Sequence, residues 1–240
     1  MKTRFLNNKK LGFSLFLILL WSGPFLYSNP TEGSIAAGSA TINDILKTTL
    51  INQSSDKLII NWRDFSIASD ETTRFIMPSA SSSVLNRVTG GNLSSILGTL
   101  QGNGNVYLIN PNGVLMGAGA NIQCNSFIAS TLDISNNNFL AGGDLNFSGD
   151  SSAKITNLGK INAAGGDVFL IARQIENHGE IRAEKGTVGL ASGSEILLKP
   201  AGSERIFVKA GTIPAGTAIE QQGYSRRFER RLRRQGLFRV

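Results

Sequence analysis

Apolar residues alternate with polar ones over much of the chain, and two neighbouring segments repeat the same pattern. Residues 155–170 and 175–190 carry identical amino acids at eight of sixteen aligned positions, most of them alternate positions. Alternation is the period of a β-strand, whose successive side chains point to opposite faces. Both segments contain an Asn-x-Gly triplet, Asn157–Gly159 and Asn177–Gly179, and both residue types tolerate the backbone of a tight turn. A 20-residue repeat of short strands and turns predicts one coil of a solenoid.

The same pattern of strands and turns continues, with less regular spacing, through the rest of the chain. Examples are the segments 58–62, 106–109, 128–132 and 206–208. Helical periodicity is weak, so we expect an all-β fold, a right-handed parallel β-helix of about nine coils stacked roughly 4.8 Å apart around a core of Val, Ile, Leu and Ala. The segment Val168–Ile171 is apolar at every position. This predicts that small extra-helical β elements, or a partner, cover part of the outer surface.

The first 28 residues have the pattern of a secretory signal peptide. A basic stretch over 1–10 precedes an apolar run over 11–21. That run is shorter than the roughly 20 residues that span a bilayer. Gly23 and Pro24 interrupt it, and Ser28 suits the position before a cleavage site; an N-terminal membrane anchor is the alternative. We divide the chain into a signal peptide (1–28), a β-helix domain (29–223) and an Arg-rich tail (224–240).

The net charge of +7 comes from the two ends of the chain. The first ten residues carry four basic side chains and no acidic one, and residues 225–240 carry seven arginines and one glutamate, which leaves −3 for the body between them. A mildly acidic body offers no basic surface to a phosphate backbone, so we expect no nucleic-acid partner for the main domain. In the tail, Phe228 and Leu232 are four residues apart, the spacing of a short basic amphipathic helix that could bind anionic membrane or nucleic acid. A short divergent end, or a disrupted reading frame in a once longer gene, is the favoured alternative.

The sequence contains little that resembles a catalytic or metal site. Cys124 and His178 are the only residues of their types, and neither has metal-ligand spacing around it, so we expect no metal, no cofactor and no disulfide. We interpret Cys124 as a buried strand residue and His178 as an exposed turn residue. The rival class is a β-helical polysaccharide lyase or glycosidase, which needs convergent acidic side chains. The acidic residues that are close in sequence are interpreted as solvated loop residues, which predicts that the protein is not an enzyme: Asp64, Asp70, Glu71, Asp144 and Asp150.

Several motifs occur in a fixed order over about residues 34–210: Ala37–Ile42, Ile60–Ile67, Val84–Asn92, Ser95–Gly98, Gly104–Gly117 and Phe127–Asp133. In these motifs the chain resembles the two-partner-secretion (TPS) domain of the filamentous haemagglutinin and haemolysin-like exoproteins, the haemagglutination activity domain. The resemblance implies Sec-dependent export in a Gram-negative bacterium, followed by periplasmic capture by a cognate outer-membrane β-barrel transporter. It implies passage in an unfolded state, folding of the β-helix outside, and a secreted or surface-exposed product. Full-length members are usually adhesins, haemolysins or toxins, so a host or bacterial surface receptor or a glycan is a further expected partner.

The strongest of these matches contains Asn110-Pro111-Asn112-Gly113, which we predict to be the main determinant of secretion. Pro111 fixes its own φ, and the Asn112-Gly113 pair favours a tight turn. Two roles stay open: the motif forms a turn on which the coil depends, or it contacts the transporter directly. Asn86, Gly90 and Gly98 are a second, weaker set of candidates. A product that is exported but has lost its effector region, a relic of a longer exoprotein, is an alternative outcome.

Overall fold

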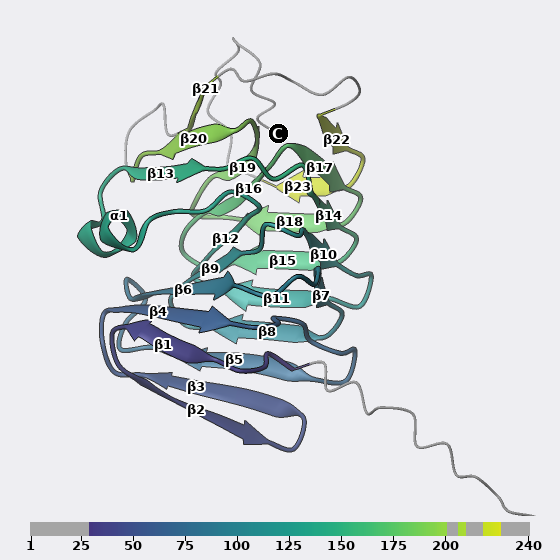
Figure 1. The fold of residues 1–240 in the computed structure, drawn as a ribbon. Coiled ribbons are helices and arrows are strands. Elements are labelled where there is room, and N and C mark those ends of the chain that lie inside the picture. Colours follow the sequence, from purple (N-terminus) through teal and green to yellow (C-terminus); the bar gives the residue numbers. More distant parts are fainter. Residues whose placement is uncertain (1–28, 201–205, 210–217, 227–240) are drawn as a thin grey trace, which may run out of the picture.

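The computed structural model describes residues 29–200, 206–209 and 218–226. It is a parallel β-helix in which each coil runs through three sheets in turn (Figure 1). The predicted signal peptide at 1–28 lies outside the described residues, as does the tail from residue 227 onward. Within the described ranges, no helix is both long and apolar enough to cross a bilayer.

Three sheets form the sides of the solenoid. Sheet 1 has the order β1 (Ser34–Ala37), β4 (Lys57–Trp62), β6 (Ser83–Val88), β9 (Asn105–Ile109), β12 (Ser126–Ser130), β16 (Val168–Ala172) and β19 (Val188–Ser192). Sheet 2 has the order β2 (Ala40–Ile45), β3 (Thr48–Gln53), β5 (Thr72–Ile76), β8 (Thr99–Gly102), β11 (Asn121–Cys124), β15 (Lys160–Ala163), β18 (Glu180–Ala183) and β23 (Tyr224–Arg226). Sheet 3 has the order β22 (Ile219–Gln221), β17 (Gln174–Asn177), β14 (Lys154–Asn157), β10 (Val114–Met116) and β7 (Ser94–Ile96).

Each coil passes from sheet 2 to sheet 1 and then to sheet 3, which coil 1 reaches only through the isolated bridge between Ile67 and Ile96. We number the coils from the N-terminus. Coil 1 is 48–71, coil 2 is 72–98, coil 3 is 99–120, coil 4 is 121–159, coil 5 is 160–179 and coil 6 is 180–223. The solenoid therefore has about six turns, and the prediction of nine coils was wrong. The reason is that coils 4 and 6 leave the solenoid path, coil 4 over 131–153 and coil 6 over the described residues 193–200 and 206–209, so fewer residues are left for further coils.

Both ends of the solenoid differ from its middle. At the N-terminal end, β1 pairs antiparallel with β4 and β2 pairs antiparallel with β3, so the first coil is capped rather than left with two open edges. At the C-terminal end, β23 pairs in parallel with β18. The sheet thus extends three residues into the range that the sequence assigned to the tail.

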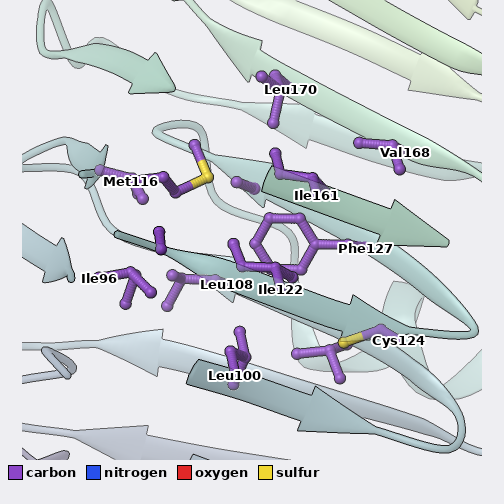
Figure 2. Close-up of a cluster of buried hydrophobic side chains, with 14 of the residues drawn as sticks. Ile96, Leu100, Leu108, Met116, Ile122, Cys124, Phe127, Ile161, Val168 and Leu170 are labelled. Carbon is purple, nitrogen blue, oxygen red and sulfur yellow. The ribbon is translucent and has the colours of Figure 1, made fainter. Parts of the chain in front are cut away.

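The interior is filled by columns of apolar side chains, one from each coil. Leu100, Ile122 and Ile161 lie above one another on sheet 2, as the registers of their strands require. On sheet 1, Phe127 lies between Val106 and Val168. Figure 2 shows Leu100, Ile122, Ile161, Phe127 and Val168 together with Ile96 and Met116 of sheet 3, and each of these side chains is at most 1% exposed. Close-packed columns of this kind explain the alternation seen in the sequence.

The outer face of sheet 1 is covered as well, which confirms the prediction of extra-helical β elements. The excursions of coils 4 and 6 supply an antiparallel sheet of β13 (Leu145–Ser148), β20 (Glu195–Leu198) and β21 (Ile206–Lys209). A second apolar cluster fills the space beneath it and includes Phe147, Phe169 and Ile171. The segment Val168–Ile171 is apolar on both faces because both faces are buried.

One short helix, α1 (Asn136–Ala141), was not predicted. Its N-cap is Ser135, whose hydroxyl accepts a hydrogen bond from the backbone of Asn138, and it ends at Gly142, whose φ is +72°. Its sequence is too short to show a helical period. It lies in the coil 4 excursion, where it buries Phe139.

Candidate secretion determinant

The turn between β9 and β10 is formed by the four residues of the predicted motif. The backbone N–H of Gly113 donates to the carbonyl of Asn110 at 3.0 Å. The N–H of Asn112 donates to the side-chain oxygen of Asn110 at 2.9 Å, which closes a second, side-chain-mediated turn. Gly113 has φ +106°, and a Cβ there would lie 2.9 Å from the carbonyl oxygen of Lys154. The position therefore requires glycine both for its backbone conformation and for space.

Asn110 joins this turn to coil 2. Its side chain is fully buried, and its amide donates to the carbonyl of Asn92 and to the hydroxyl of Ser94, both at 2.9 Å. Asn112 adds a bond from its own amide to the carbonyl of Gly90 at 2.8 Å. Every polar atom of the Asn110 side chain is therefore used, which is the condition for burying an amide at low cost.

The same turn is also bonded to coil 4. The N–H of Asn110 donates to the carbonyl of Ser130 at 2.9 Å, and the hydroxyl of Ser151 donates to the carbonyl of Pro111 at 2.6 Å. Pro111 and Asn112 remain exposed between these contacts, whereas Asn110 and Gly113 are buried. The motif thus presents Pro111 and Asn112 at the surface, while bonds from all four residues hold coils 2, 3 and 4 together.

The structure brings only one member of the weaker set to this turn. Gly90 accepts the bond from Asn112, and a Cβ on Gly90 would lie 2.2 Å from the carbonyl of Arg63, so this glycine permits a close approach of coils 1 and 2. Gly98 lies at another corner, between sheets 3 and 2, where a Cβ would lie 2.1 Å from the carbonyl of Ala68. Both positions are constrained by backbone packing.

Asn86 lies inside the solenoid, away from the turn surface. It is completely buried, its oxygen accepts from the indole N–H of Trp62 at 2.9 Å, and its amide donates to the carbonyl of Tyr107 at 3.1 Å. The asparagine therefore satisfies the one polar atom of a buried tryptophan. In the folded state this side chain is not accessible to a partner.

Sequence reasoning missed three residues that hold the turn. Asn92 and Ser94 lie in or beside a motif that was recognised, so their proximity to Asn110 could have been inferred once a coil length was known. Ser151 has no such signal, because it is 40 residues from Pro111 and reaches it only through the path of the coil 4 excursion.

Three of the five acidic residues considered for catalysis are engaged in separate local contacts, and the other two, Asp144 and Asp150, are exposed. Asp64 accepts from the amide of Asn92 at 3.0 Å, and Glu71 accepts from the backbone of Ala68 at 2.9 Å. Asp70 is ion-paired with Lys47, and the hydrogen bond from that lysine lowers the pKa of Asp70. Over the described ranges, no three His, Cys, Asp or Glu side chains are grouped in a way that could hold a metal ion.

The two singular residues lie where the sequence placed them. Cys124 is buried on β11, and desolvation raises the pKa of its thiol, so the reactive thiolate is disfavoured. His178 is exposed in the turn between β17 and β18.

Comparison with known proteins decides the family. A family model described as the TPS secretion domain matches residues 27–234. The chain belongs to the TPS secretion domain family. It is 34% identical over 192 residues to a heme/hemopexin-binding protein of Haemophilus influenzae, an alignment that covers 75% of this chain and 21% of that protein. A second heme/hemopexin-binding protein of Haemophilus influenzae is 38% identical over 128 residues, covering 50% of this chain and 14% of that protein. The chain therefore spans about a fifth or less of the length of these relatives.

Two solved structures share the architecture of this TPS domain. The secretion domain of HMW1 from Haemophilus influenzae has a TM-score of 0.68 and 34% sequence identity, over 83% of this chain and 52% of that one. The filamentous hemagglutinin secretion domain has a TM-score of 0.56 and 14% identity, over 78% of this chain and 72% of that one, and it supports the fold alone. TPS domains are recognised by a cognate outer-membrane transporter and belong to secreted or surface exoproteins of Gram-negative bacteria. The family and these neighbours are secretion domains rather than enzymes.

Proposed function

We propose that the Asn110–Gly113 turn is the part of this TPS domain on which transporter-dependent release depends. The observation that supports the proposal is that the four residues of the motif differ in exposure. Pro111 and Asn112 are exposed, and Asn110 and Gly113 are buried and bonded to coils 2 and 4. A transporter can contact the exposed pair, and the chain needs the buried pair to complete coil 3 after passage.

In this proposal, residues 1–28 direct Sec-dependent export and are removed, and residues 29–223 form the unit that the transporter captures. Capture takes place in the periplasm, where the transporter contacts Pro111 and Asn112, and passage through the pore follows in an unfolded state. After passage, coil 3 closes onto coil 2 as Asn110 finds Asn92 and Ser94. The hydrogen bonds gained outside the cell then stabilise the folded, released state.

The test is fractionation of cells that express the chain with and without its cognate transporter. Wild-type protein is expected in the medium only when the transporter is present, and in the periplasm without it. Mass spectrometry of the released protein reads the N-terminus, which is expected close to residue 29. Retention in the periplasm with both components present would contradict the proposed route.

A pair of single substitutions tests the exposed part of the motif. Because the Asn112 amide also bonds to Gly90, the unfolding midpoint of each variant is measured alongside its release. Asn112→Ala changes an exposed side chain of the motif, and Asn162→Ala changes an exposed asparagine on β15 that lies outside it. We expect Asn112→Ala to lower release several-fold and Asn162→Ala to leave it unchanged. Equal release of the two variants would mean that the Asn112 side chain does not contact the transporter and that the motif acts only in forming the coil.

The released product is proposed to act in adhesion, as part of an adhesin or haemagglutinin that contacts a host or bacterial surface receptor or a glycan. Support comes from the relatives, since the matched secretion domains belong to HMW1 and to filamentous hemagglutinin. The polysaccharide-active enzyme is not favoured. Purified released protein is expected to bind cells or immobilised glycans in a saturable manner. Absence of saturable binding would favour the alternative that the product is exported but has lost its effector region.

A further inference from the structure

The coil 4 excursion, residues 131–153, reaches back across the outer face of sheet 1 to coils 1 and 2. It leaves the solenoid after β12, forms α1 and β13, and returns at β14. Figure 1 shows α1 at the side of the solenoid, beyond the ends of the sheet 1 strands. Two basic side chains, Lys57 on β4 and Arg87 on β6, hold it in this position.

Lys57 closes the C-terminal end of α1. Its ammonium donates to the carbonyl of Phe139 at 3.0 Å and to that of Leu140 at 2.7 Å, more than 80 residues away in sequence. The last carbonyls of a helix have no partner within the helix, and a cation is favoured there. A helix of one and a half turns is not stable on its own. The persistence of α1 therefore depends on coil 1.

Arg87 holds the N-terminal side of the same element. Its guanidinium donates to the Asp133 carboxylate at 2.9 Å, to the Asn136 side chain at 2.8 Å and to the carbonyl of Ile134 at 2.6 Å. The Arg87 side chain is only 15% exposed, whereas its partner Asp133 is 57% exposed, so the guanidinium is held at the edge of the covered surface. This network joins coil 2 to the start of α1.

Apolar contacts follow the polar ones. Phe139 is 2% exposed and packs edge-on against Tyr107 of β9, with ring centres 5.3 Å apart. Ile134 and Phe139 belong to the same buried cluster as Ile59 of coil 1 and Leu85 of coil 2. The excursion thus covers side chains from coils 1, 2 and 3 that would otherwise be exposed.

We propose that the coil 4 excursion is a folding latch that converts coils 1 to 4 from a stack of weakly coupled turns into one cooperative unit. A solenoid without such a brace is stabilised only between neighbouring coils and can open from its end. The latch closes only when Lys57, Arg87 and residues 133–141 are all outside the pore. This proposal rests on the proposed export function. Once residue 141 has emerged from the transporter pore, the latch can close, and the folded domain then resists moving back into the pore.

Hydrogen–deuterium exchange on the full chain purified from the medium tests the latch. Lys57→Met and Arg87→Met remove the donors and retain long apolar stems. In the double variant we expect amide exchange in α1, β4 and β6 to rise about tenfold or more, with exchange in β15 to β18 unchanged. The matched control is Arg63→Met, which removes an exposed ion pair with Glu32 close to the end of β4.

Faster exchange confined to α1, with β4 and β6 as protected as in the wild type, would overturn the latch and leave the excursion as a passive cover. Should the double variant yield no released protein, Asp133→Asn keeps an acceptor and removes the charge, and a smaller rise in the same three elements is expected. Release that proves independent of the transporter would defeat the proposed function, while the exchange comparison would still decide the latch.

Discussion

The turns that end at Gly113 and at Gly179 both contain a buried asparagine, but the two side chains are held in different ways. Asn177 lies in a ladder: it accepts from the amide of Asn157 at 2.7 Å and donates to Gln221 at 3.0 Å. Each member contacts a planar amide in the coil before or after it. Asn110 instead contacts a backbone carbonyl, a serine hydroxyl and its own turn.

The difference bears on the register of the coils. In a repeated ladder the side-chain amides of successive coils are equivalent. If one coil were displaced by a full turn of the solenoid, its amide would still meet another amide. The partners of Asn110 have no equivalent in coils 4 to 6, so this turn fits one place only. A unique set of partners specifies register where a repeated set does not. We therefore expect the Asn110 turn to specify register more strictly than the ladder.

The largest expected effect comes from removing Asn110. Asn110→Ala should lower the free energy of unfolding by about 3 kcal/mol, because buried partners in two coils lose their hydrogen bonds. Asn177→Ala should cost less, about 2 kcal/mol, because one of its two partners, Gln221, is only partly buried and can bond to water instead. Urea unfolding of the two variants side by side provides the measurement. Equal losses would mean that the two turns are equivalent.

Gly113 gives a second contrast with its surroundings. Gly113→Ala should cost about 2 kcal/mol, because alanine is strained at φ +106° and its Cβ would press on the backbone of coil 4. Gly143 also has a positive φ, +74°, but a Cβ there meets nothing within 4 Å. Gly143→Ala is therefore the control for conformational strain alone. If Gly113→Ala lowers the free energy of unfolding no more than Gly143→Ala does, the backbone of coil 4 moves aside to accommodate the added Cβ.

The ladder itself predicts coupling. Asn157→Ala and Asn177→Ala should each destabilise the domain, and the double variant should cost less than their sum by about 0.5–1 kcal/mol, because the first substitution already breaks the shared bond. A double-mutant cycle in urea measures this difference. Strict additivity would mean that the amide–amide bond contributes nothing.

The smallest effect lies on the surface of sheet 3 beside the ladder. Lys154 donates to both carboxylate oxygens of Glu176, at 3.0 and 2.9 Å, and this hydrogen bond lowers the pKa of Glu176. A depressed carboxylate pKa stabilises the fold above its unfolded value of about 4.3 and ceases to do so as the pH falls through the folded value. Glu176→Gln should cost under about 1 kcal/mol at pH 7 and nothing at low pH. Unfolding midpoints of the wild type and of Glu176→Gln, measured from pH 7 down to low pH, would show whether the difference in stability between the two proteins disappears.

The fold was predictable where the chain repeats. The eight identities between 155–170 and 175–190 correspond to residues that stack directly above one another, such as Ile155 on Ile175 and Ala163 on Ala183. The number of coils was not predictable, since the excursions contain strands with the same alternation as the coils. Helix α1 was missed because its stability comes from Lys57 and Arg87, which are distant in sequence.

The sequence was sufficient to predict that the candidate site is a turn, but not that this turn is bonded to the neighbouring coils. Asn110-Pro-Asn-Gly113 has the composition of a tight turn, and it forms one. Its bonds to Asn92, Ser94 and Ser151 depend on how coils are stacked, which single-sequence periodicity does not specify. Asn86 shows the opposite limit: the motif that contains it was recognised, but its contact with Trp62 places it in the core.

The most direct test compares release of two matched double variants in cells that express the transporter. Asn110→Ala with Asn112→Ala alters the unique turn, Asn157→Ala with Asn177→Ala alters the ladder, and Leu100→Ala in the core of coil 3 controls for lost stability alone. We predict that the first variant accumulates in the periplasm, with inner-membrane export intact, while the other two appear in the medium. Normal release of the first variant, or equal retention of all three, would contradict the assignment of secretion to the Asn110–Gly113 turn.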